Sequence, residues 1–139
     1  MAVNLDDFMA VLAGCLAAIV PAGFHVRVSG GILLYSADEG RFPGQSGNYQ
    51  VGLAGTDVRA NFGYCETVED NIVRVAVLAL DDLQDFIDEA THDPWPGTRT
   101  PPRPHGRLTG SMLHLWYGEN DNAVLACEPI PLAGIMPPG

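Results

Sequence analysis

Three aspartates in the second half of the chain, Asp81, Asp85 and Asp88, have a spacing that places their carboxylates on one face of a helix. Like charges at this spacing repel each other, and carboxylates in the C-terminal half of a helix also oppose its dipole. Such a face can attract a cation or a basic polypeptide, so we expect these three aspartates to contribute to binding. A merely solvated acidic surface is the alternative.

Large aromatic residues form a second candidate feature. Trp95 lies in a proline-rich segment, whereas Trp116 and Tyr117 lie in a predicted strand. Aromatic side chains on a sheet, beside an extended proline segment, can form a recognition surface. We therefore include Trp95, Trp116 and Tyr117 in the expected binding surface. The alternative is that the proline segment folds back on Trp116 and covers the sheet.

Residue types that support catalysis are present, but few have a useful spacing. His114 with a nearby carboxylate such as Glu119 makes an enzyme one alternative, because imidazole and carboxylate groups can transfer protons. The residues around Ser46 lack the spacing and context of a nucleophile elbow. Asp88 and His92 lie one helical turn apart, but a metal site needs at least one further ligand. We predict no catalytic residue, no metal site and no cofactor.

The cysteines, Cys15, Cys65 and Cys127, are far apart in the sequence and odd in number. None belongs to a CxxC pair, so neither a disulfide framework nor a zinc site is expected. The four residues that end at Cys15 match a lipoprotein cleavage box. However, Asp6 and Asp7 precede it and no basic residue does, which favours an ordinary helix. We expect free thiols and a cytoplasmic location.

The charge of the chain restricts its partners. Net charge is −10 over 139 residues, and all seven lysine or arginine side chains are arginine. Nucleic acids and anionic membranes attract cationic proteins, so neither is expected as a partner. No apolar stretch approaches the roughly 20 residues of a membrane span. A basic protein partner is consistent with the charge.

Two segments, residues 5–20 and 67–90, repeat apolar side chains with a helical period. Asn4 and Thr67 can cap their first turns. The first of these helices is apolar or small on all sides. Such a helix is usually buried on two sides or packed against a second copy of the protein, so we expect a homo-oligomer.

The remaining segments alternate or contain turn residues. Strands are expected at residues 24–28, 32–35, 112–117 and 123–128, with a short one at 49–53, while 55–65 is ambiguous. We interpret residues 93–106 as a proline-rich surface connection and 129–139 as a loose or extended tail. The chain is therefore predicted to be a single α+β domain over residues 1–139. An antiparallel sheet of four to five strands with two helices, in the order α-β-β-(β)-α-β-β, is expected.

Parts of the sequence resemble a group of small uncharacterised proteins of actinobacteria and their phages. The likeness covers most of the chain and is carried by residues 41–47, 79–85, 89–97 and 113–118. It implies no known activity and no catalytic residues, and it adds association with a phage as a possible location. The absence of lysine is consistent with a GC-rich source.

We therefore expect a non-catalytic protein-binding or adaptor protein with a basic partner. Two alternatives stay open. One is a small acidic secretion-type chaperone, because such chaperones share the order of helix, strands, helix and strands, which is a fold-level analogy alone. The other is an enzyme that uses His114 and nearby carboxylates; a cleft with convergent titratable groups would favour it.

Overall fold

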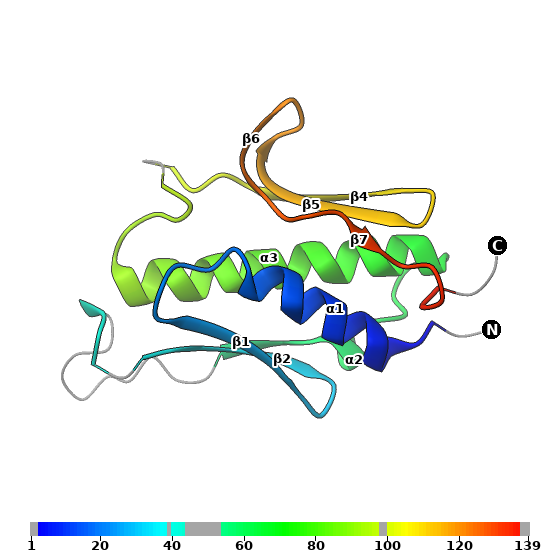
Figure 1. Cartoon of the computed structure of the whole chain (residues 1–139), viewed down its shortest axis with the longest axis horizontal. Helices are drawn as coiled ribbons and strands as arrows, with labels where there is room; N and C mark the ends of the chain where they lie inside the picture. The colour runs from blue at the N-terminus through cyan, green and yellow to red at the C-terminus, as the bar shows by residue number, and fades with distance from the viewer. Residues whose placement is uncertain (1–2, 39, 44–53, 98–99, 137–139) are drawn as a thin grey trace.

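The computed structural model describes residues 3–38, 40–43, 54–97 and 100–136. Figure 1 shows the elements of this part of the chain. In order they are α1 (Leu5–Ala17), β1 (Phe24–Ser29), β2 (Ile32–Ala37), β3 (Ala54–Asp57), α2 (Val58–Asn61), α3 (Val68–Thr91), β4 (Pro104–Thr109), β5 (Met112–Glu119), β6 (Asn122–Ala126) and β7 (Ile130–Pro131).

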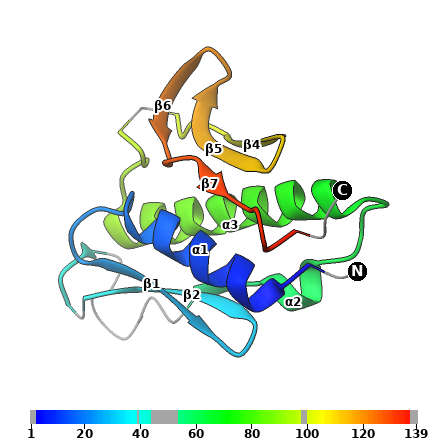
Figure 2. The same ribbon diagram turned by 45° about the vertical axis from the view of Figure 1, so that its right-hand side comes forward.

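The strands form two antiparallel sheets rather than one. Sheet A has the order β1-β2-β3, and sheet B has the order β4-β5-β6, with β7 also paired to β5. Helix α3 lies between the two sheets, and α1 packs against β1 and β7 (Figures 1 and 2). The predicted α+β class is confirmed. The expected number of sheets and helices is wrong, since the described chain has two sheets and three helices. The reason is that α3 is apolar on two flanks, and a separate sheet packs against each flank.

Helix α3 begins where its sequence predicts. The Thr67 hydroxyl accepts a hydrogen bond from the Asp70 amide at 3.1 Å, which caps the first turn. The helix ends at His92, whose left-handed backbone (φ 59°) stops the helical hydrogen bonds. Between these ends the helix buries most of its apolar side chains, including Ile72, Val75, Ala76, Ala79, Leu80, Leu83 and Ile87.

A tyrosine from each sheet is hydrogen-bonded to the middle of α3. Tyr35 of sheet A donates to the carbonyl of Ala79 at 3.2 Å, and Tyr117 of sheet B donates to the carbonyl of Leu80 at 2.6 Å. Both tyrosines are fully buried. Burial raises the pKa of both phenols above their usual range. The two hydroxyls therefore stay protonated and hold the sheets on opposite flanks of consecutive helical residues.

Helix α1 buries one face only. Phe8, Leu12 and Leu16 are fully buried between sheet A and sheet B, where α1 crosses the core. Gly14 and Ala17 lie on the exposed face of the helix. Of the two alternatives expected for this helix, burial on two sides does not hold within the chain, because its face of small residues is open to solvent. Packing against a second copy stays a prediction.

A buried side chain of α3 holds the proline-rich connection at two points. The Gln84 amide donates to the carbonyl of Trp95 at 3.0 Å and to the carbonyl of Pro102 at 2.7 Å. The connection then enters β4, which begins at Pro104. Proline is tolerated there because it is the first residue of an edge strand.

Other local predictions have mixed outcomes. Residues 55–61 of the ambiguous segment belong to β3 and α2, and the tail pairs its residues Ile130 and Pro131 with β5. Leu132 follows that strand and is fully buried. The expected strand at 49–53 and the Ser46 segment lie outside the described residues.

Candidate functional site

We define the acidic strip as three aspartates of α3, namely Asp81, Asp85 and Asp88. The strip lies away from most of the core. Asp81 and Asp85 are exposed, whereas Asp88 is half-buried. Partial burial raises the pKa of Asp85, and repulsion from Asp81 and Glu89 raises it further. Repulsion at the predicted helical spacing is therefore present at Asp85.

Asp88 has a structural role that its spacing does not reveal. Its carboxylate accepts a hydrogen bond from the Trp95 amide at 2.7 Å, which fixes the chain just after α3. Burial raises the pKa of Asp88, and this hydrogen bond opposes the rise. Asp88 is therefore already paired, in contrast to the two exposed aspartates of the strip.

Asp82 is a second acid with a structural partner. It accepts a hydrogen bond from the Thr56 hydroxyl at 2.7 Å, and the Thr56 hydroxyl is also 2.7 Å from the Tyr35 hydroxyl. Burial raises the pKa of Asp82. The acid therefore connects α3 to sheet A, a contact between residues that are far apart in the sequence.

The one arginine of α3 does not neutralise the strip. The Arg74 guanidinium donates to the carbonyl of Asn61 at 2.9 Å and lies 5.2 Å from the centre of the Tyr64 ring. Among the described residues, neither Asp81 nor Asp85 forms an ion pair; the ion pairs are His25–Asp38, Arg41–Asp38 and Arg59–Asp6. The charge of both carboxylates thus remains available to a partner.

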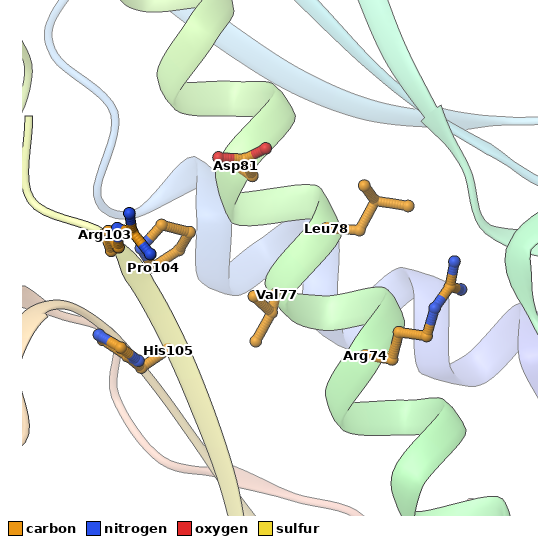
Figure 3. Close-up of a pocket in the computed structure, with 7 residues that line it drawn as sticks. All are labelled: Arg74, Val77, Leu78, Asp81, Arg103, Pro104 and His105. Atoms are coloured by element: carbon orange, nitrogen blue, oxygen red, sulfur yellow. The ribbon is translucent and has the colours of Figure 1, made fainter. Parts of the chain in front are cut away.

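A pocket of about 510 Å³ adjoins the strip, and we call it the α3–β4 pocket. Figure 3 shows Asp81, Arg103 and Pro104 toward one end and Arg74 toward the other. The lining combines apolar atoms with both signs of charge and comprises Arg74, Val77, Leu78, Asp81, Arg103, Pro104 and His105. Because Asp81 belongs to both features, a bound segment can contact the pocket and the strip together.

The structure divides the three aromatic residues of the expected surface. Tyr117 is fully buried and points toward α3, so it is not on the surface. Trp95 is half-buried, and its ring contacts the Tyr117 ring edge-on with centroids 5.1 Å apart. Strand alternation, which places Leu113, Leu115 and Tyr117 on one face, is the sequence signal that could have assigned Tyr117 to the core.

Trp116 lies on the opposite face of sheet B. Its ring stacks on the His105 ring at 5.7 Å, and the Arg107 guanidinium lies 5.9 Å from its centre. Its buried indole N–H has no hydrogen-bond acceptor among the described residues. His105 belongs to the segment 93–106 that was expected to form the proline connection, and the structure places it in β4, so this segment contacts Trp116 through a strand residue.

His114 lines a pocket of about 270 Å³ on the same face of sheet B, together with Arg107 and Trp116. No described residue that lines this pocket is acidic. Glu119 is exposed at the end of β5, where it pairs with Asn122. The arrangement required for the enzyme alternative, a carboxylate beside His114, is therefore not found in this pocket.

A third, larger hollow of about 770 Å³ lies beside the exposed face of α1. Val11, Gly14, Cys15, Ala18 and Ile19 form its helical wall, and residues 125–126 and 128–131 form the other. Most of this lining is apolar, although Glu128 contributes a charge.

Within the described residues, no group of three or more histidine, cysteine or acidic side chains is arranged to hold a metal ion. No helix in that part of the chain has both the length and the apolar character needed to cross a membrane. Comparisons with protein-family models, with curated proteins and with solved structures found no match for this chain.

Proposed function

We propose that this chain is a non-catalytic binding protein that docks a basic polypeptide segment along the acidic strip of α3. The observation that carries the proposal is that Asp81 and Asp85 face solvent without an ion-pair partner among the described residues, while Arg74 is engaged elsewhere. Partial burial raises the pKa of Asp85 and repulsion from neighbouring carboxylates raises it further, so a bound cation would relieve an existing unfavourable interaction. Asp88 and Tyr117 are left out of the proposed contact because both have structural partners.

The neighbouring pocket adds a requirement on the partner. Val77, Leu78 and Pro104 offer an apolar lining that an aliphatic side chain can fill. Arg74 and Arg103 line the same pocket and would repel a basic side chain inside it. The segment that fits best therefore places an apolar residue in the α3–β4 pocket and basic residues over Asp81 and Asp85.

The proposal is tested with a synthetic peptide in which arginines recur at every fourth residue around one leucine. Fluorescence anisotropy should detect binding that weakens as salt is added, because exposed charges are screened. The double variant Asp81→Asn/Asp85→Asn should weaken this binding about tenfold or more, at roughly 1.4 kcal/mol per factor of ten. The control Asp7→Asn/Asp121→Asn removes the same charge at exposed positions outside the strip and should bind like the wild type. Equal losses in both variants would show that net charge alone attracts the peptide.

Removing the charge of Asp85 should also stabilise the isolated protein. The raised pKa of Asp85 means that the folded state favours the neutral acid. The stability that goes with the neutral form of Asp85 is therefore lost as pH rises through that pKa. We expect Asp85→Asn to raise the free energy of unfolding by about 0.3–1 kcal/mol at neutral pH and by nothing near pH 3. Urea denaturation at both pH values measures this, with Asp121→Asn as the control. A decrease at neutral pH would mean that Asp85 has a stabilising partner.

We further propose that the chain self-associates through the exposed face of α1. Two copies repel each other because each has a charge of −10. A contact through this face would keep the repulsion low, because few of its side chains are charged. Light scattering of concentrated wild-type protein should give a mass above that of the monomer, and Ala10→Arg or Ala17→Arg should reduce it to the monomer mass. A monomeric wild type at high concentration would contradict the proposal.

A further inference from the structure

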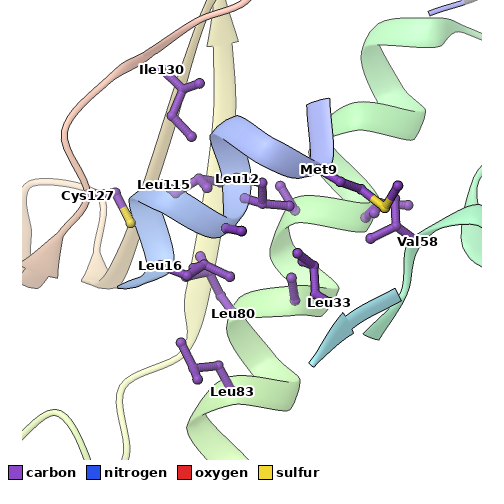
Figure 4. Close-up of a cluster of buried hydrophobic side chains, with 14 of the residues drawn as sticks. Met9, Leu12, Leu16, Leu33, Val58, Leu80, Leu83, Leu115, Cys127 and Ile130 are labelled. Carbon is purple, nitrogen blue, oxygen red and sulfur yellow. The ribbon is translucent and has the colours of Figure 1, made fainter. Parts of the chain in front are cut away.

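Two cysteines that are distant in the sequence meet where α1 approaches the segment after β6. Cys127 is buried, and its backbone amide donates to the carbonyl of Leu115 at 2.9 Å, which fixes it against sheet B. Figure 4 shows Cys127 beside the C-terminal turns of α1. The Cys15 sulfur lies 3.8 Å from the carbonyl oxygen of Glu128, the residue that follows Cys127.

The two thiols interact directly and differ in character. A hydrogen bond with the Cys127 thiol lowers the pKa of Cys15, although burial and the Glu128 carboxylate act in the opposite direction. The same hydrogen bond, together with burial, raises the pKa of Cys127. The proton is therefore kept by the buried Cys127, and the half-exposed Cys15 ionises first.

We propose that Cys15 and Cys127 are a redox-active thiol pair that forms an intramolecular disulfide when the chain meets a small-molecule disulfide. Cys15 is the attacking thiol, because it is the more exposed of the two and lines the hollow beside α1. Cys127 is the resolving thiol, because it is held next to Cys15 by the backbone of sheet B.

The reaction consists of two thiol–disulfide exchanges. The Cys15 thiolate attacks one sulfur of the small disulfide, whose S–S bond breaks and releases one thiolate, which takes up a proton. Cys127 then loses its proton and attacks the Cys15 sulfur of the mixed disulfide, which releases the second small thiol. Two protein thiols are oxidised, and one small disulfide is reduced to two thiols.

Oxidation would join α1 to the chain between β6 and β7. Cys65 has no place in this exchange, since it lies in the loop before α3, where its backbone is hydrogen-bonded to the Asn71 side chain. It therefore serves as an internal control of general thiol reactivity. The proposal concerns a different part of the surface from the acidic strip and does not depend on the proposed binding function.

The test is to incubate the full chain with oxidised glutathione at a protein concentration where it is monomeric, followed by intact-mass and peptide analysis. Wild type and Cys65→Ser should both lose two hydrogens and yield a Cys15–Cys127 linked peptide. Cys127→Ser should stop at a glutathione adduct on Cys15, and Cys15→Ser should react at least tenfold more slowly than Cys65→Ser. A stable glutathione adduct on the wild type without the internal link, a disulfide that includes Cys65, or only intermolecular disulfides would overturn the proposal. The peptide analysis of the wild type decides the question even if a variant fails to fold.

Discussion

Leu80→Ala is expected to lower the free energy of unfolding by about 2–5 kcal/mol, the range found when a fully buried leucine is truncated in a packed core. Leu80 is fully buried in α3, between the two sheets. Figure 4 shows it in one cluster with Leu16 of α1 and Leu115 of sheet B. A void at this position therefore affects contacts among three layers, and neighbouring backbone that is fixed by the Tyr117 hydrogen bond has little freedom to close it.

Leu78→Ala is the matched control for this prediction. It makes the same change in the same helix, two residues away, but Leu78 is only half-buried and lines the α3–β4 pocket. We expect its truncation to cost about 1 kcal/mol or less, because solvent already reaches the side chain. Urea denaturation of both variants measures the difference. Equal losses would contradict the placement of Leu80 at the centre of the core.

Gln84→Glu is expected to destabilise the protein by about 2–4 kcal/mol at neutral pH, the second large effect. The Gln84 amide is buried and donates to two backbone carbonyls, those of Trp95 and Pro102. A carboxylate of the same shape cannot donate to either one, and its charge would face two carbonyl oxygens. The proline connection would thereby lose two hydrogen bonds to α3, at the Trp95 and Pro102 carbonyls, while the hydrogen bond from the Trp95 amide to Asp88 would remain.

The pH dependence of the stability of Gln84→Glu shows how much of the loss is due to the new charge and how much to the lost hydrogen bonds. The introduced carboxylate should have a raised pKa in the folded state, so the loss of stability should shrink as pH falls and the group takes up a proton. Gln84→Met removes both donors without adding a charge and should cost less than Gln84→Glu at neutral pH. Denaturation curves at neutral and acidic pH measure this. A Gln84→Glu variant as stable as the wild type at neutral pH would contradict the buried position of the amide.

The sequence predicts the elements with regular periodicity and misses those that tertiary contacts create. Helix α3 was predicted within one residue at each end, because its cap and its apolar period are local signals. Strand β4 was missed because Pro104 and Gly106 argue against a strand. The structure explains Gly106: a Cβ at this position would lie 3.0 Å from side-chain carbons of both Val77 and Leu115. The glycine allows β4 to approach α3 closely, and no local pattern shows this.

The candidate site was predictable only in part, for a related reason. Asp82, Asp85 and Asp88 look alike in the sequence, yet Asp82 pairs with Thr56, Asp88 pairs with the Trp95 amide, and Asp85 faces solvent with no ion-pair partner among the described residues. Thr56 lies in β3 of sheet A, so the spacing of residues within α3 cannot reveal its contact with Asp82. Helical spacing predicts which side chains share a face, whereas the structure determines which of them remain free to bind.

The central claim, that the acidic strip and the α3–β4 pocket together bind a basic segment, is tested most directly by an NMR titration of labelled protein with the arginine–leucine peptide. The account predicts that backbone amide shifts concentrate at residues 77–89 of α3 and at Arg103 and His105, on either side of Pro104, which has no amide hydrogen. It also predicts that these shifts become much smaller in Asp81→Asn/Asp85→Asn at the same peptide concentration. Shifts that map to another surface, such as the outer face of sheet A, or that persist unchanged in the double variant, would contradict it.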